Sequence, residues 1–87
     1  MLRISEKVGE DSVHVRVEGV LDNQSVSLLS DVCSRHLETS ERIILNLGGL
    51  VDISREGVEF LRKSAARVLI VDAPQFVMLS MRGPRIT

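Results

Sequence analysis

Residues 42–61 constrain the fold of this chain more than any other part of the sequence. They open with an apolar run, residues 43–47, in which Asn46 is the only polar side chain. A run of this length, rich in β-branched residues, is typical of a strand that is buried on both faces. Gly48-Gly49 then predicts the end of the strand. Asp52 is expected in the loop that follows.

A helix is predicted directly after this loop. Val58, Leu61 and Ala65 recur at the spacing i, i+3, i+7, which is the apolar stripe of a helix packed on a core. Ser54 is the natural N-cap, because its hydroxyl can accept a hydrogen bond from an N–H group of the first turn. Glu56 lies in that turn, where the helix dipole favours a carboxylate. A functional surface is therefore expected at this exposed helix start.

The N-terminal segments predict an antiparallel hairpin. Residues 2–8 and 13–18 each alternate between apolar and polar side chains, and residues 9–12 are typical of a turn. His14 falls on the polar side of the second strand, so we expect it to be solvated. His36 lies on a different element without the spacing of metal ligands, and no metal site is predicted.

The first helix is predicted over residues 24–38, with Asp22 or Asn23 as its N-cap. Its apolar residues share one face and indicate a core-facing stripe: Val26, Leu28, Leu29, Val32, Cys33 and Leu37. Cys33 lies within that stripe. We therefore expect it to be a small buried hydrophobic residue and not a reactive thiol.

The last third of the chain predicts a short strand and a short helix. Residues 68–71 form a second apolar run, read as another interior strand, and residues 72–74 end it. Pro74 suits the first turn of a helix. That helix carries Phe76, Val77, Leu79 and Met81 and stops at Gly83-Pro84. The tail after it is expected to fray.

The predicted order is therefore β-β-α-β-α-β-α. Helical connections between apolar strands require parallel pairing, whereas the hairpin is antiparallel. The sequence thus predicts an α/β fold with a small mixed four-stranded sheet and helices mainly on one face. A length of 87 residues suits one domain, spanning residues 1–87.

The composition excludes several classes of function. The formal net charge is −1, and the chain has no Trp or Tyr and only two Phe, so neither the charge nor the stacking surfaces of a nucleic-acid binder are present. No apolar run approaches a membrane span or a signal peptide. A single cysteine cannot form an internal disulfide, which fits a cytoplasmic protein.

Two segments resemble the STAS domain, the module shared by anti-sigma-factor antagonists and the cytoplasmic tails of sulfate transporters. Residues 18–22, Glu-Gly-Val-Leu-Asp, are similar to the family's strand ending in Gly-x-Leu-Asp. Residues 45–58 align without gaps on the family's Leu-Asp-Leu-Ser-Gly-Val-x-Phe-Ile-Asp-Ser-Ser-Gly-Leu, with Gly57 at the helix start. The resemblance implies a bacterial cytoplasmic regulator of transcription that binds an anti-sigma factor, a kinase, without a cofactor.

The chain departs from the family where the family's switch lies. In the antagonists the serine directly after the Asp is phosphorylated by the anti-sigma factor, and the phosphate blocks the complex. Here Ser54 stands in the place of the Asp and Arg55 in the place of the serine. Arginine cannot accept a phosphoryl group, and it places a fixed positive charge at that point. Asp22 matches the family's acidic position nearby.

Several alternatives stay open from the sequence. Ser54 is either only an N-cap or a displaced phosphorylation site, and Asp52 is either a displaced acid or a solvated side chain. Arg55 is either a partner contact or a plain surface residue. The second and last helices look shorter than those of the family, which favours an exposed apolar patch or a partner.

The sequence is compatible with three functions. The first is a non-catalytic module that docks a kinase-like regulatory partner, with a contact surface of Asp22, Asp52, Ser54, Arg55, Glu56 and Gly57. The alternative is a module that senses a small ligand, nucleotide or anion at the N–H groups of the second helix. An enzyme ranks last, because no catalytic or metal-binding arrangement is recognisable. Self-association as a homodimer, and membership of a longer protein, are left open.

Overall fold

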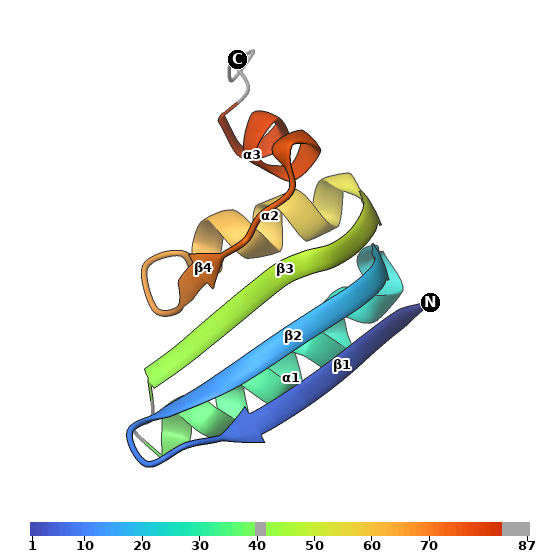
Figure 1. The fold of residues 1–87 in the computed structure, drawn as a ribbon. Helices are drawn as coiled ribbons and strands as arrows, with labels where there is room; N and C mark the ends of the chain where they lie inside the picture. The colour runs from blue at the N-terminus through green and yellow to red at the C-terminus, as the bar shows by residue number, and fades with distance from the viewer. Residues whose placement is uncertain (40–41, 83–87) are drawn as a thin grey trace.

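A computed structural model describes residues 1–39 and 42–82 of the chain. Within this part the helices and strands follow the predicted order (Figure 1). They are β1 (Leu2–Val8), β2 (Ser12–Leu21), α1 (Asn23–Glu38), β3 (Arg42–Ile53), α2 (Arg55–Ser64), β4 (Leu69–Val71) and α3 (Gln75–Arg82). The predicted stop at Gly83-Pro84 and the tail after it lie outside the described residues.

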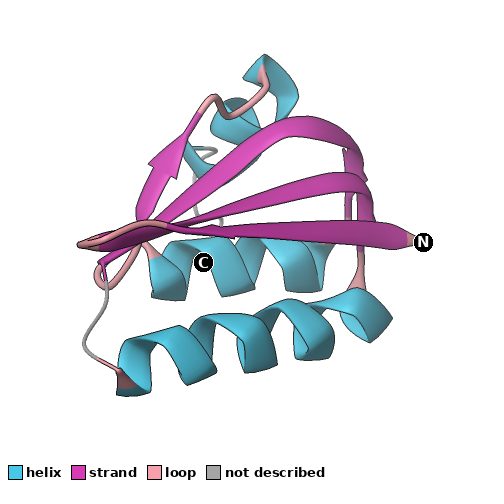
Figure 2. Cartoon of the chain, turned by 60° about the horizontal axis from the view of Figure 1, so that its bottom comes forward, coloured by secondary structure: helices cyan, strands magenta, loops and turns pink. Residues whose placement is uncertain are grey.

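The four strands form one mixed sheet in the order β1-β2-β3-β4. β1 and β2 pair antiparallel, as the hairpin prediction requires, whereas β2 with β3 and β3 with β4 pair parallel. Figure 2 shows α1 and α2 side by side beneath the same face of the sheet. The predicted α/β class, the mixed sheet and the helices on one face are therefore confirmed.

The core lies between this face of the sheet and the two helices. Alternate residues over 13–17 of β2 and 43–47 of β3 point into it. This alternation was predicted for β2, but the prediction that residues 43–47 are buried on both faces is wrong, because Ile44 and Asn46 lie on the other face and are only half-buried. The side chains there are fully buried and come from β2, β3, α1 and α2: Val13, Val15, Val17, Leu21, Ile43, Leu45, Leu47, Leu29 and Leu61. Cys33 is also buried, as predicted. None of the described helices is long and apolar enough to span a membrane.

The opposite face of the sheet carries polar side chains, and His14 is exposed there as predicted. The guanidinium of Arg16 on β2 donates to Asn46 Oδ1 at 3.1 Å. The amide nitrogen of Asn46 donates to Asp72 Oδ2 at 2.8 Å, directly after β4. Asn46, the one polar residue of the central run, therefore joins β2 to the end of β4 through hydrogen bonds.

The prediction that Gly48-Gly49 ends the central strand is wrong, because β3 continues to Ile53. The pairing of β2 with β3 shifts register between Arg16 and Glu18, which is an irregularity of the β-bulge kind. A Cβ at residue 49 would lie 2.4 Å from Cγ of Glu18. Glycine therefore lets the two strands approach each other at this irregularity and does not terminate the strand.

The prediction of a second interior strand near the C-terminus is also wrong. β4 lies at the edge of the sheet and comprises only Leu69–Val71, so Val68 precedes it. Leu69 is 56% exposed. An apolar run therefore does not by itself distinguish an interior strand from an edge strand, because the covering of each face depends on the helices that pack there.

Four apolar residues of the helices do not lie in the core, and two of them, Leu28 and Ala65, belong to the predicted stripes. Leu28 of α1, Phe76 and Leu79 of α3, and Ala65 at the end of α2 are exposed. α3 contacts α2 and buries Val77, and Met81 packs partly against the core. The guanidinium of Arg62 on α2 holds the last turn of α3 by donating to the carbonyls of Ser80 and Met81 at 3.1–3.2 Å.

Candidate functional site

The carboxyl ends of two neighbouring parallel strands bring the predicted site residues together. Leu21, the last residue of β2, pairs with Ile53, the last residue of β3. The N–H of Ser54 donates to the carbonyl of Leu21 at 2.8 Å and fixes the two strand ends to each other. Asp22 and Ser54 therefore follow adjacent residues of the sheet, and each begins a helix.

Asp22 is the N-cap of α1 and is held by its own helix. Its Oδ1 accepts hydrogen bonds from the N–H groups of Gln24 and Ser25 at 3.1 and 3.0 Å. The Ser25 hydroxyl donates to the same carboxylate and accepts from the N–H of Asp22, which completes a capping box. The hydrogen bonds from Ser25, its backbone N–H foremost, lower the pKa of Asp22 below its ordinary 3.8. Asp22 is therefore ionised and already engaged.

Ser54 is the N-cap of α2, as predicted. Its Oγ accepts a hydrogen bond from the N–H of Gly57 at 3.2 Å, and its carbonyl accepts from Val58. The serine is half-buried. Its hydroxyl oxygen therefore stabilises the helix start by satisfying one of the free N–H groups of the first turn.

Arg55 and Glu56 form the first turn of α2, and both are exposed. Asp52 is exposed as well, but it lies on β3 and not in a loop, so that part of the prediction is wrong. Its Oδ1 accepts from the N–H of Ile53 at 2.9 Å. The strand continues through Asp52 because its neighbour Ile53 still pairs with β2.

Gly57 differs from the other predicted site residues because it is buried. A Cβ at this position would lie 2.7 Å from the carbonyl oxygen of Leu21 and 2.8 Å from Cγ1 of Ile53. The first turn of α2 therefore packs directly on the backbone of β2. Gly57 sets how closely the helix start approaches the sheet, and it is not available for direct contact with a partner.

A shallow depression lies beside this helix start, between α1 and α2. It is lined by Val26 from α1 and by five residues of α2: Arg55, Glu56, Glu59, Phe60 and Lys63. Its apolar part comes from Val26 and Phe60, and both kinds of charge surround it. Both apolar side chains are half-buried and also pack against the core. Val26 belongs to the predicted stripe of α1, whereas Phe60 lies outside the predicted stripe of α2.

The described residues include no cluster of three or more His, Cys, Asp or Glu side chains that could hold a metal ion. Burial raises the pKa of the Cys33 thiol, and the carboxylate of Glu6 adds to the rise. A buried thiol with a raised pKa is a poor nucleophile. The groups gathered at the helix start are caps and solvated charges, an arrangement suited to binding.

No protein-family model and no curated protein matches the sequence. Solved structures, in contrast, match over most of the chain. The anti-sigma factor antagonist SpoIIAA in its unphosphorylated form has a TM-score of 0.66 and 18% identity, covering 97% of this chain and 84% of its own. This similarity shows that the chain has the SpoIIAA fold.

Two further structures share this fold. One is an uncharacterized protein of the DUF3478 family with a SpoIIAA-like fold from Shewanella loihica PV-4, with a TM-score of 0.60, 12% identity and coverage of 93% of this chain and 74% of that one. The other is Mglu, with a TM-score of 0.66 and 24% identity over 82% of this chain. The chain spans only 20% of the length of Mglu.

Proposed function

We propose that this chain, which has the SpoIIAA fold, is a non-catalytic protein-interaction module of bacterial transcription regulation. It docks a kinase-like anti-sigma factor in the cytoplasm through the start of α2 and the ends of β2 and β3. One observation carries the proposal. The first turn of α2 is fixed to the sheet, exposes Arg55 and Glu56, and borders a partly apolar depression.

The physical features of this surface suit a protein partner. Interfaces combine an apolar centre with a polar rim, and here Val26 and Phe60 supply the centre while the charges of α2 supply the rim. The surface is also preorganised, because the bond from Ser54 N–H to the Leu21 carbonyl and the tight packing of Gly57 fix α2 before a partner arrives. Preorganisation lowers the entropic cost of binding.

The proposed docking does not use the family's phosphorylation switch. Arg55 occupies the position of the phosphorylated serine and cannot take its role. Ser54 acts as a cap in this proposal, since its oxygen already accepts the N–H of Gly57. The positive charge of Arg55 is therefore a constant part of the surface, and the partner is expected to present an acidic side chain to it.

The test is the variant Arg55→Glu. It reverses the charge in the first turn of α2, so affinity for the partner should fall at least about tenfold, the loss typical of a charge reversal in an interface. The partner is captured from a bacterial lysate with the wild-type chain, identified by mass spectrometry, purified, and titrated against both proteins by calorimetry.

Arg42→Glu is the matched control. Arg42 is also exposed, but it begins β3 and so lies at the opposite end of that strand from the site. The control should bind as the wild type does. Equal affinity of the wild type and Arg55→Glu would contradict docking at the start of α2.

Anion or nucleotide sensing is the weaker alternative. Glu56 already places a carboxylate in the first turn of α2, where the helix dipole would otherwise favour a bound anion. We expect no shift in melting temperature with inorganic phosphate or with nucleotides. A stabilisation by either one that Arg55→Glu abolishes would favour sensing over docking.

The proposed docking surface leaves β1, at the far edge of the sheet, available for self-association.

A further inference from the structure

The edge strand β1 directs a set of backbone groups away from the sheet. The N–H of Gly9 donates to Ser12 at 2.7 Å, and the carbonyl of Met1 accepts from Val20 at 3.2 Å. Both are odd-numbered residues, and the direction of backbone groups alternates along an antiparallel strand. The odd residues therefore pair with β2. The even residues direct their N–H and C=O groups to the open side of β1: Leu2, Ile4, Glu6 and Val8.

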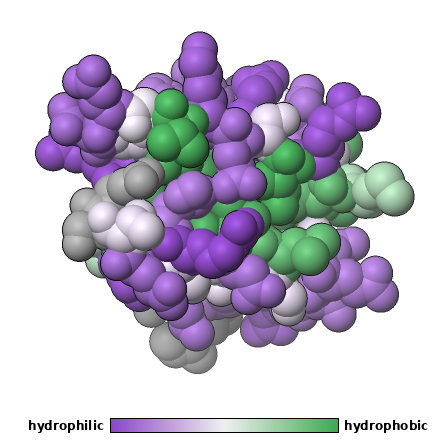
Figure 3. Space-filling model, turned by 90° about the horizontal axis from the view of Figure 1, so that it is seen from below, coloured by the Kyte–Doolittle hydropathy of each residue, from purple (hydrophilic) through white to green (hydrophobic). Residues whose placement is uncertain are grey.

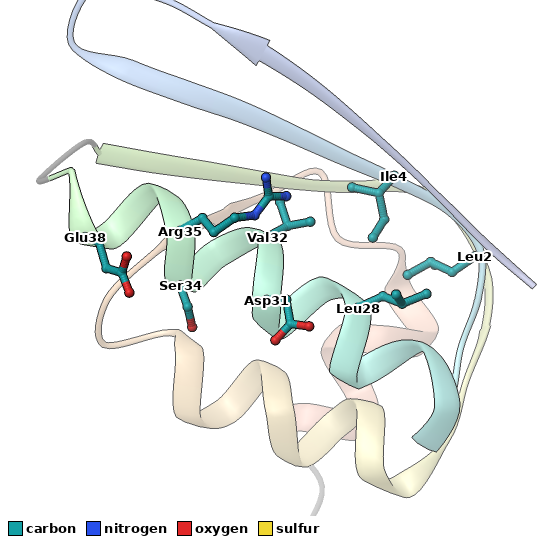
Figure 4. Close-up of a pocket in the computed structure, with 8 residues that line it drawn as sticks. All are labelled: Leu2, Ile4, Leu28, Asp31, Val32, Ser34, Arg35 and Glu38. Atoms are coloured by element: carbon teal, nitrogen blue, oxygen red, sulfur yellow. The ribbon is translucent and has the colours of Figure 1, made fainter.

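A partly apolar groove runs directly beneath this open edge, between β1 and α1 (Figure 4). Its apolar residues are Leu2 and Ile4 from β1 and Leu28 and Val32 from α1. Leu28 is 59% exposed, although it shares the apolar stripe of its helix. Figure 3, seen from the side on which β1 lies in Figure 1, shows apolar surface framed by hydrophilic residues.

We propose that two copies of this chain associate about a two-fold axis through this surface. Their β1 strands pair antiparallel at the open edges, and the two sheets join into one. Each copy uses the same surface, as a two-fold dimer requires. The groove of each copy is covered by the other, which removes Leu28 from water. This dimer goes beyond the docking function, because it uses a different surface.

The charges on β1 select the register of this pairing. Side chains directly opposite each other lie on the same face of the joined sheet. The two-fold axis must therefore pass through a residue of β1, and this central residue pairs with its own copy. If the axis passed through Ser5, Arg3 would lie opposite Lys7 of the other copy. If it passed through Glu6, the two Glu6 side chains would lie opposite each other. Both registers bring like charges together, which is unfavourable. A centre at Ile4 pairs Ile4 with its own copy and Arg3 with Ser5.

The charges of α1 fit the same axis. α1 leads from the end of β2 back to the start of β3, so it runs in the direction of β1, and the two-fold axis makes the two α1 helices antiparallel. Asp31 and Arg35 are one turn apart and both line the groove (Figure 4). Asp31 of each copy therefore faces Arg35 of the other, and the surface is complementary in charge to itself.

Glu6 does not oppose this association. An inward-pointing charge on an edge strand normally discourages strand pairing, because it would be buried without a partner. The carboxylate of Glu6, however, lies 2.5 Å from His36 Nε2 on α1 of the same copy. It enters the joined sheet already hydrogen-bonded.

The experiment is a charge exchange between two variants, read by sedimentation velocity and by light scattering after size exclusion. Wild type should be a dimer. Asp31→Arg and Arg35→Asp each place like charges across the axis, so each should dissociate at least about tenfold more readily than wild type. An equal mixture of the two should form a heterodimer, since opposite charges then face each other at both places. Lys63→Glu, a charge reversal on α2, should dimerise as wild type does.

Ile4→Pro provides an independent test of the strand pairing. It removes an N–H that points to the open edge and leaves the hydrogen bonds between β1 and β2 intact. It should be monomeric with an unchanged far-ultraviolet circular dichroism spectrum. Should it fail to fold, the charge exchange decides alone. A monomeric wild type, single reversals that remain dimers, or a mixture that remains monomeric would each overturn the proposed dimer.

Discussion

At the scale of single residues, Gly57 shows how the backbone of one element limits which residue another element can carry. Its neighbour in space is the last residue of β2, more than thirty positions earlier in the chain. The sequence indicates a glycine at a helix start, which is an unfavourable place for helix propensity. The close contact with Leu21 explains the glycine, because the side chain of any larger residue would collide with the backbone of β2.

Replacing Gly57 with alanine should therefore destabilise the fold. The added methyl group would overlap the carbonyl oxygen of Leu21, and such overpacking costs about 1–3 kcal/mol. The free energy of unfolding is measured by urea denaturation. Gly48→Ala is the control, since the nearest atoms to a Cβ there lie farther away, at 3.1 and 3.3 Å, and belong to the side-chain ends of Asn46 and Arg16 and not to the backbone. Equal losses in both variants would contradict the argument.

The cap at Asp22 should make stability depend on pH in a defined direction. The pKa of Asp22 is lower in the folded protein than its ordinary 3.8, so the folded state holds the proton less tightly than the unfolded chain. The stabilisation is complete above pH 3.8 and is lost as the pH falls below 3.8 through the lower folded pKa.

The variant Asp22→Asn isolates this contribution. Asparagine keeps a capping oxygen but has no charge to titrate in this range. Urea midpoints of wild type and variant, measured from neutral pH down to about pH 2, should keep a constant difference above pH 3.8. Below that value the wild type should lose stability relative to the variant. A difference that stays constant over the whole range would show that the carboxylate is not stabilised in the fold.

At the scale of elements, the two parallel neighbours β3 and β4 differ in length because they receive different cover. β3 lies between two strands and extends over residues 42–53, whereas β4 pairs with β3 alone among the described strands and ends after Val71. Asp72 follows with a φ of 54°, a left-handed conformation that is unusual for a residue other than glycine. The hydrogen bond from Asn46 helps to hold it there.

Asn46→Ala should therefore loosen β4 while leaving the hairpin unchanged. It removes the hydrogen bond to Asp72, whose net value is about 1 kcal/mol, so amides of Leu69–Val71 should exchange about fivefold faster. Hydrogen exchange followed by nuclear magnetic resonance measures this, with β1 and β2 as internal reference. Ser5→Ala, on the same face of the sheet, should leave β4 unaffected. Equal acceleration in all strands would indicate global destabilisation instead.

At the scale of the whole molecule, the fold separates two surfaces. The proposed docking site lies where β2 and β3 end and α1 and α2 begin, and the proposed dimer interface lies along β1 (Figure 1). Because β1 is an edge strand and contributes no residue to the helix starts, a dimer would leave both docking sites accessible. Partner binding and self-association can then be lost independently, and the two sets of variants distinguish them.

The sequence by itself determined the element order, the mixed sheet, the Ser54 N-cap and the burial of Cys33, and it narrowed the N-cap of α1 to Asp22 or Asn23. These follow from local patterns: alternation, helical spacing and capping chemistry act over a few residues and do not depend on distant parts of the chain. The resemblance of residues 45–58 to the STAS motif also led to the fold that the solved structures share with this chain.

Only the tertiary structure decided the rest. Gly48-Gly49 lies within a strand because β2 needs room at an irregularity in the pairing, and β4 is an edge strand because no described strand pairs with its other side. Leu28 is exposed although it shares the apolar arc of α1, because helix packing decides which part of such an arc is covered. Such outcomes depend on contacts between residues far apart in the chain, and a local pattern contains no information about them.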